Sequence, residues 1–224
     1  GQLAGSLVII ILNKERYGFG WDRAEVGPLL RFSVPLAGSS ALLVAIANVD
    51  TVVVSRLMGS TDLGFYNQAF NIANWPIAWF SSILVTLTVP TFARALDDLP
   101  ELREHVRAAM SLLAAAAFPL AAVLTVLAEP VVVVLYGERW RPAAPVLSVL
   151  GLLTGVRLIQ VLFNDLLIAL GETRAMLLAQ AIWLVALVPA MVVGVSAGGI
   201  VGAAWVHVAV GVVVVIPTFL VIVR

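Results

Sequence analysis

The chain has 224 residues, of which 62% are hydrophobic and only 12% are charged, and its mean hydropathy is +1.07. Soluble domains carry about 25% charged residues, so this composition excludes a soluble globular protein and predicts an integral membrane protein. Basic and acidic residues balance at 13 each, which gives no electrostatic reason to expect a nucleic-acid partner. Cysteine is absent, which excludes disulfides and thiolate chemistry, and two histidines are too few to suggest a histidine-rich metal centre.

The first 31 residues are predicted to precede the main membrane domain. Residues 1–12 are apolar but too few to cross a bilayer, which takes about 20 residues. They lack a basic leader and a cleavage site, so we interpret them as the end of a preceding transmembrane helix and not as a signal peptide. Residues 13–31 are predicted to be a cytoplasmic linker between two lobes. The sequence is therefore expected to be a fragment of a longer membrane protein.

Residues 32–224 are predicted to form one lobe of six transmembrane helices. Only a helix satisfies its own backbone hydrogen bonds in lipid, and the sequence lacks the alternating pattern of membrane barrel strands. The predicted spans are residues 35–57, 65–92, 110–128, 143–170, 176–197 and 200–223. Residues 131–136 are too short to cross and are expected to form an interfacial helix.

The distribution of basic residues supports this topology. One side of the membrane would carry nine of them, namely Lys14, Arg16, Arg23, Arg31, Arg94, Arg103, Arg107, Arg174 and Arg224. The other side would carry three, namely Arg56, Arg139 and Arg141. Because positive residues accumulate in cytoplasmic loops, the side with nine is predicted to be cytoplasmic.

Polar residues of the fourth span suggest a cavity within the membrane. Arg157 lies near the midpoint of the span, where a charge costs about 2.5–3.5 kcal/mol on insertion scales. Arg157, Gln160 and Asn164 fall within about 60° of one another on a helical wheel, and Asp165 lies about 80° from Arg157. One interpretation is a stripe that faces a cavity, with Arg157 meeting an anionic substrate. The alternative is a buried structural network in which Arg157 pairs with an acid elsewhere.

Two acidic residues within the spans are candidates for ion coupling. Asp50 lies toward the outer end of the first span, where a buried carboxylate could bind a cation or a proton. The alternative is a helix-end carboxylate paired with Arg56, although six residues separate them and they share a helix face poorly. Asp165 is expected to face either a neighbouring helix or an ion.

Amides follow one side of the second span. Asn67 and Gln68 are predicted to hydrogen-bond neighbouring helices, whereas Asn71 and Asn74 are predicted to line a cavity. His207, in the last span, is expected to be a satisfied packing residue.

Several motifs together resemble the polysaccharide-exporting branch of the multidrug/oligosaccharidyl-lipid/polysaccharide flippase superfamily, the Wzx-type flippases. In chain order they are Asp50-x5-Arg56-x2-Gly59-x3-Leu63-Gly64-x-Tyr66-x2-Ala69, Pro90-x2-Ala93-Arg94, Tyr136-Gly137-Glu138-Arg139-Trp140-x-Pro142-Ala143 and Ala169-x-Gly171. They extend over about 120 residues, and the spans around them fit the family's pattern.

The resemblance implies a MATE-like, V-shaped carrier of two six-helix lobes that works by alternating access. This chain would be the end of the sixth helix and the second lobe, and the missing N-terminal lobe would complete the central cavity. The implied substrate is undecaprenyl-diphosphate-linked oligosaccharide, flipped across the bacterial inner membrane, with membrane lipids and polysaccharide polymerase or export machinery as partners. Cavities of this family are cationic, which makes Arg157 the first candidate for the diphosphate and Arg31, at the cytoplasmic mouth, the second.

Other functions remain open at this point. A cation-coupled drug antiporter of the same superfamily would depend on Asp50 or Asp165, and a non-transporting scaffold of a polysaccharide synthesis complex would depend on neither. We expect no enzyme, cofactor or metal site, because the sequence holds no phosphate-binding loop, His-Glu metal motif or paired carboxylates.

Overall fold

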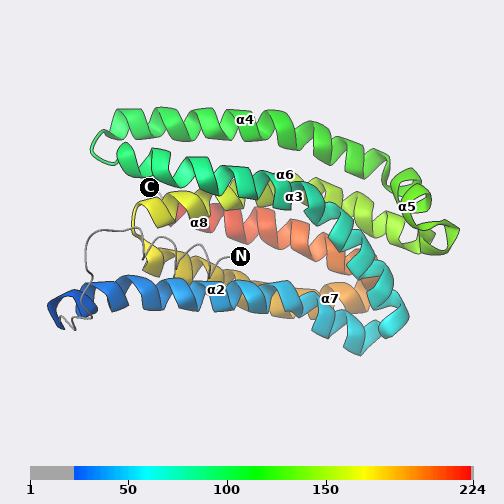
Figure 1. Cartoon of the computed structure of the whole chain (residues 1–224). Coiled ribbons are helices and arrows are strands. Elements are labelled where there is room, and N and C mark those ends of the chain that lie inside the picture. Colours follow the sequence, from blue (N-terminus) through cyan, green and yellow to red (C-terminus); the bar gives the residue numbers. More distant parts are fainter. Residues whose placement is uncertain (1–22, 223–224) are drawn as a thin grey trace, which may run out of the picture. The chain divides into compact units, whose positions relative to one another are not determined.

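The computed structural model describes residues 23–222, and each secondary-structure element in that range is helical (Figure 1). In chain order these are α2 (Arg23–Met58), α3 (Ser60–Arg94), α4 (Leu99–Val126), α5 (Ala128–Tyr136), the 3-10 helix η1 (Glu138–Ala143), α6 (Ala144–Ala169), α7 (Thr173–Val210), the π-helix η2 (Gly211–Val215) and α8 (Ile216–Ile222). The chain divides into two compact units, Gly1–Arg31 and Phe32–Arg224. The predicted helix end at residues 1–12 lies outside the described residues. The predicted linker, residues 13–31, is described only from residue 23 onward, and that part is helical.

Local sequence explains where helices begin and end. Gly59 separates α2 from α3 with a φ of 88°, a backbone conformation that costs glycine least. Asp98 caps α4, because its side chain accepts a hydrogen bond of 3.1 Å from the backbone N–H of Glu101. Pro100 then occupies the first turn, where its missing N–H leaves no helical bond unmade.

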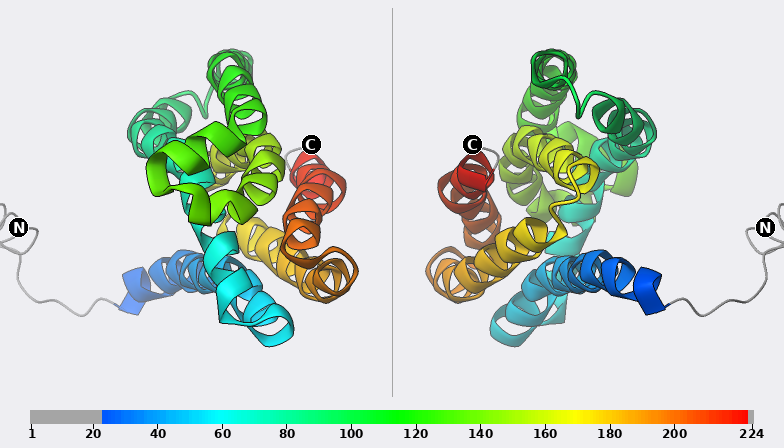
Figure 2. Two further views of the ribbon diagram at one scale, coloured as in Figure 1. Left: turned by 90° about the vertical axis from the view of Figure 1, so that its right-hand side faces the viewer. Right: turned by 90° about the vertical axis from the view of Figure 1, so that its left-hand side faces the viewer.

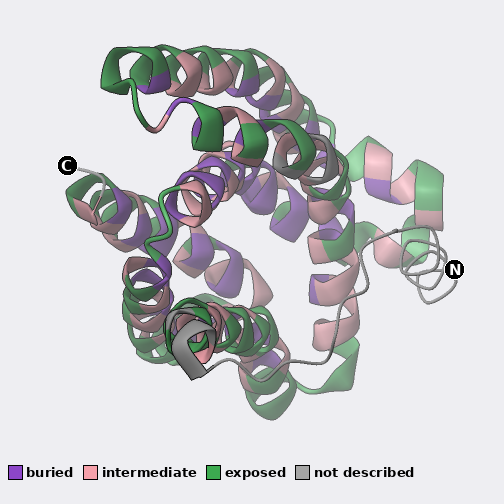
Figure 3. Ribbon diagram, turned by 60° about the vertical axis from the view of Figure 1, so that its left-hand side comes forward, coloured by how far each residue is buried: buried purple, intermediate pink, exposed green. Residues whose placement is uncertain are grey.

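α6 lies at the centre of the second unit and is its most buried span. It packs against α3 and α4 on one side and against α7, η2 and α8 on the other (Figure 2). Buried residues lie on the sides of the helices that face one another (Figure 3). Leu147, Leu150 and Leu153 of α6 join Tyr66 of α3 and Leu187 of α7 in the largest core cluster. Polar residues on α6 therefore lie among several neighbouring helices.

α7 consists of two arms joined at Gly198 and Gly199. Gly199 has a φ of 59° and a ψ of −144°, so the helix breaks there. A Cβ at Gly202 would collide with the backbone of Gly194, which shows that the two arms lie in direct contact. The second arm then runs back beside the first (Figure 1).

The chain is an all-α membrane protein. By length and composition four described helices could cross a membrane, or five if the two parts of α3 form one bent span. Those parts, Ser60–Ser81 and Thr86–Arg94, meet at 42°, and Pro90 within the second part lacks the N–H of a helical hydrogen bond. The two arms of α7 enter that count as one helix, and the predicted six-helix lobe stays a prediction.

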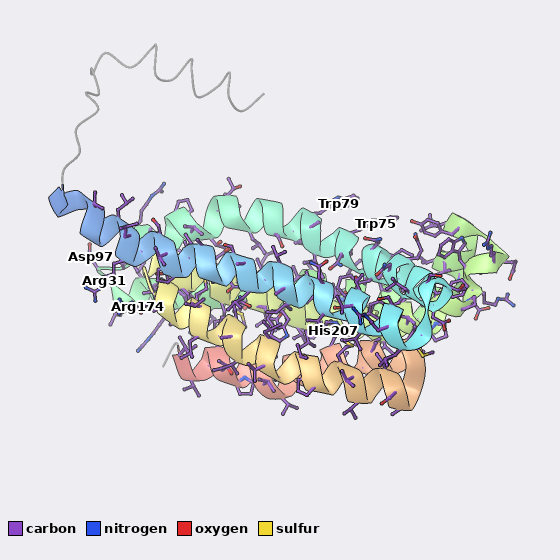
Figure 4. The ribbon with its side chains drawn as sticks, turned by 90° about the horizontal axis from the view of Figure 1, so that it is seen from below. Arg31, Trp75, Trp79, Asp97, Arg174 and His207 are labelled. Carbon is purple, nitrogen blue, oxygen red and sulfur yellow. The ribbon has the colours of Figure 1, made fainter. Side chains whose placement is uncertain are left out.

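The loops predicted to be cytoplasmic lie at one end of the second unit. Asp97, between α3 and α4, and Arg174, at the start of α7, lie at the same end in Figure 4. α5 and η1 lie at the other end (Figure 1). This arrangement agrees with the alternation of basic residues along the sequence.

Candidate functional site

Arg157 is held in the middle of α6 by two residues of α3. Its Nη1 donates a 2.5 Å hydrogen bond to Oδ1 of Asn74. Its guanidinium lies over the ring of Phe70, with Cζ 4.5 Å from the ring centroid, a cation–π contact. Phe70 and Asn74 are four residues apart and therefore share a helix face. In the described part of the chain Arg157 makes no ion pair, so the predicted pairing with an acid is not observed.

Arg157 opens into a cavity of about 340 Å³, which we call the Arg157 cavity. Its lining comes from α2, α3, α6 and α7, and all of it belongs to the second unit. The walls are mostly apolar, and the polar lining residues are Asn74, Arg157, Gln160, Asn164 and His207. A mostly apolar pocket with a few convergent polar groups is the usual form of a small-molecule site.

The predicted stripe on α6 faces this cavity. Gln160 is only 5% exposed and has no hydrogen-bond partner among residues 23–222, although it lines the cavity. Asn164, one turn further, accepts a 3.4 Å hydrogen bond from Gln180 of α7. A buried amide that lacks a protein partner can offer its donors and acceptor to a ligand.

Other predicted site residues lie elsewhere. Asn71 was predicted to line the cavity, but it is exposed and is not part of the lining. The reason is its position on α3, because it lies about 100° round the helix from Phe70, whose side faces Arg157. Arg31 is exposed and lies in the first unit.

The two candidate ion-coupling residues have different surroundings. Asp165 is buried and accepts a 2.6 Å hydrogen bond from the Thr88 hydroxyl of α3, outside the Arg157 cavity. It therefore faces a neighbouring helix, one of the two alternatives that the sequence left open.

Asp50 is part of a buried cluster that joins α2, α3 and α7. Its Oδ2 accepts a 2.9 Å hydrogen bond from the Tyr66 hydroxyl and lies 3.1 Å from Nε2 of His207. His207 lies among the helices in Figure 4. Oδ1 of Asp50 is buried without a partner in the described part of the chain. The alternative pairing with Arg56 is wrong, because Asp50 is 3% exposed and bound to this cluster whereas Arg56 is exposed.

Sequence reasoning missed three members of the site. Phe70 could have been found, because it lies four residues before Asn74 on the same face. His207 and Trp183 of α7 line the cavity only because the fold brings that helix beside α6, and no spacing in the sequence indicates it. No group of three or more His, Asp or Glu residues that could hold a metal occurs within residues 23–222.

Comparisons with known proteins identify the family. The family model described as "Polysaccharide biosynthesis protein" matches residues 1–145. The chain belongs to this family. The match ends before Arg157, so the family model does not cover the α6 and α7 residues of the cavity.

Two of three similar proteins carry names from polysaccharide biosynthesis, and the third is named a probable flippase. It is 28% identical to the lipopolysaccharide biosynthesis protein WzxC of Escherichia coli K12, over 84% of this chain and 38% of WzxC. It is 29% identical to the teichuronic acid biosynthesis protein TuaB of Bacillus subtilis, over 56% of this chain and 26% of TuaB. It is also 29% identical to a probable lipid II flippase, MurJ, of Synechocystis, over 63% of this chain and 28% of that protein. The resemblance to Wzx-type polysaccharide flippases is thereby confirmed, and no solved structure matches significantly.

The chain spans about two fifths of the length of WzxC and a smaller share of the other two relatives. The apolar helices and the family together make it part of a multi-pass membrane protein.

Proposed function

We propose that this chain is the substrate-binding second lobe of a polysaccharide-precursor flippase. The full protein would flip undecaprenyl-diphosphate-linked oligosaccharide across the bacterial inner membrane by alternating access, with the missing N-terminal lobe as the other half of the path. The observation that carries the proposal is Arg157, a cation in the middle of a membrane-spanning helix that makes no ion pair in the described residues and opens into a cavity.

The electrostatics of Arg157 favour an anionic ligand. A membrane-buried arginine usually pairs with an acid or faces a wet cavity, because its unpaired charge is costly. Asn74 and Phe70 fix the guanidinium but take up one of its five N–H donors and one face. The remaining donors suit the oxygens of a phosphate, which arginine binds in a bidentate fashion.

The neighbouring amides suit the rest of such a headgroup. Gln160 and Asn164 lie one and two turns along α6 from Arg157 and line the same cavity. Their amides can hydrogen-bond phosphate oxygens or sugar hydroxyls, which carry both donors and acceptors. A volume of about 340 Å³ is at the lower end of small-molecule sites, so a longer oligosaccharide would extend beyond this lobe.

A cation-coupled antiporter is the second candidate, and Asp50 favours it. A buried carboxylate oxygen without a partner is a position where a coupling ion could bind. Such a protein would depend on Asp50 and tolerate a neutral residue at position 157.

The test replaces Arg157 in the full-length protein and measures surface polysaccharide in cells that lack the native copy. Arg157→Ala is expected to reduce export at least about tenfold, because a charge-assisted contact of about 1.5–3 kcal/mol is lost. Arg157→Lys should restore part of it. Arg107→Ala, which removes an exposed arginine of α4, is the matched control and should leave export unchanged.

Normal export by Arg157→Ala at normal membrane levels would overturn the proposal. Drug efflux that fails with Asp50→Asn but survives Arg157→Ala would favour the antiporter.

A further inference from the structure

Asp50 places an incompletely paired carboxylate close to the Arg157 cavity. Both hydrogen-bonding neighbours of this carboxylate, Tyr66 and His207, contact Oδ2, and Oδ1 has no partner in the described residues. A carboxylate accepts up to about four hydrogen bonds, so much of its capacity is unused. The site thus contains an arginine without an ion-pair partner and an acid with a free oxygen.

Phe70 contacts Arg157 and also the two residues that hydrogen-bond Asp50. The guanidinium of Arg157 lies over its ring, with Cζ 4.5 Å from the ring centroid. The same centroid lies 5.9 Å from the ring of Tyr66 and 5.9 Å from the ring of His207. Phe70 and His207 line the Arg157 cavity, whereas Asp50 does not.

Asp50 and Arg157 attract each other although they do not touch. Asp50 and Arg157 carry opposite charges, Phe70 contacts Arg157 as well as the two residues that hydrogen-bond Asp50, and no ion pair joins the two charges. Opposite charges attract far more strongly in a protein interior than in water, so a small change in the packing between them has a large effect. A direct contact would satisfy the free Oδ1 and occupy the donors that we assign to the ligand.

We propose that Asp50 is an internal competitor of the anionic ligand for Arg157, and that Phe70 is the positioning residue that keeps the two charges apart. The inference rests on the proposed function, in which Arg157 binds an anionic headgroup. While the Phe70 ring supports Arg157, the guanidinium is available to the ligand. A shift of α3 that withdraws the ring lets Asp50 approach Arg157 and displaces the anion, which provides a route to release.

The proposal is tested by a double-mutant cycle on the full-length protein in lipid nanodiscs. Binding of geranyl diphosphate is measured at one fixed pH for the native protein, Phe70→Leu, Asp50→Asn and the double variant. Phe70→Leu is expected to weaken binding about tenfold, and Asp50→Asn to tighten it several-fold. In the Asp50→Asn background, Phe70→Leu should cost less than about twofold, because the competing carboxylate is gone.

The cycle separates the positioning role from a direct one. If Phe70 acts only through its cation–π contact or its packing, Phe70→Leu costs the same factor in both backgrounds, and the proposal is overturned. It is also overturned if Phe70→Leu leaves affinity unchanged. Phe70→Tyr, which keeps the ring, should bind about as well as the native protein.

Two controls guard against a general loss of structure. Phe163→Leu removes a ring that stacks on Phe219 at 5.5 Å, in a separate core cluster, and should not change affinity. Asp165→Asn neutralises another buried acid and should not change affinity either. If Phe70→Leu is not monodisperse, Phe70→Met provides an unbranched side chain of similar size for the same cycle.

Arg157→Ala distinguishes failure of this inference from failure of the proposed function. If it binds geranyl diphosphate as well as the native protein, both are overturned. If it binds weakly but the cycle is additive, only the competition between Asp50 and the ligand is overturned.

Discussion

At the scale of single residues, Gln160 is the position at which a ligand-binding role of the α6 stripe can be distinguished from a structural one. It is almost fully buried, lines the Arg157 cavity and has no partner among the described residues. An amide of a structural network would be hydrogen-bonded, because an unsatisfied buried polar group costs about 1–3 kcal/mol. Because its side chain lines the cavity and has no such partner, we propose that its amide binds the ligand.

Replacing Gln160 with leucine should consequently harm function more than stability. We expect Gln160→Leu to keep or raise the thermal stability of the purified full-length protein and to lower polysaccharide export several-fold. Thermal unfolding and export, each corrected for the amount of protein in the membrane, provide the two measurements.

Thr154→Val is the matched control on the same helix. The Thr154 hydroxyl is buried without a partner within residues 23–222, but it does not line the cavity, so export should be unchanged. A Gln160→Leu protein that unfolds earlier yet exports normally per folded molecule would contradict the binding role.

The residues also show which parts of the site a sequence can reveal. Arg157, Gln160 and Asn164 belong to one helix, so helical geometry alone predicted that they share a side, and the structure places them in one cavity. The Asp50 cluster joins residues 16 and 157 positions apart in the sequence. Such contacts depend on how helices pack, which spacing within one helix does not encode. For the same reason the sequence suggested Arg56 as a partner of Asp50.

At the scale of elements, the close contact between the two arms of α7 positions His207. Gly194 and Gly202 allow the backbones to approach without intervening side chains, a common device in membrane helices. His207 follows on the second arm and reaches both Asp50 and the cavity. The break at Gly198 and Gly199 falls between the predicted spans 176–197 and 200–223.

This contact predicts that even a methyl group at position 202 is destabilising. Gly202→Ala should lower the stability of the full-length protein by about 1–3 kcal/mol, because a Cβ there meets the backbone of Gly194. Chemical unfolding of the purified protein measures the change.

Gly155→Ala on α6 is the control, and it is expected to raise the stability of the protein instead of lowering it. Apart from its own chain neighbours and the nearby backbone of α6, no atom lies within 4 Å of a Cβ at that position, and alanine favours a helix over glycine by about 1 kcal/mol. Equal stability of Gly202→Ala and the native protein would contradict direct backbone contact between the two arms.

At the scale of the whole molecule, the chain supplies one lobe of a larger membrane protein in our proposal. Its composition predicted the all-α membrane class, since so apolar a chain requires helices in lipid. Its motifs predicted the family, which the comparison confirmed. The sequence did not predict how α2, α3, α6 and α7 enclose a cavity, because that depends on their packing.

The most direct measurement of the central claim is lipid translocation by the full-length protein in proteoliposomes. The substrate is a short-chain isoprenoid diphosphate that carries a fluorescently labelled sugar, and the initial rate of its transfer between leaflets is compared for the native protein, Arg157→Ala and Arg107→Ala. We predict that Arg157→Ala is at least about tenfold slower, since the diphosphate loses its charge-assisted contact, and that Arg107→Ala matches the native rate. Equal rates for Arg157→Ala and the native protein would contradict the assignment of Arg157 as the residue that binds the diphosphate.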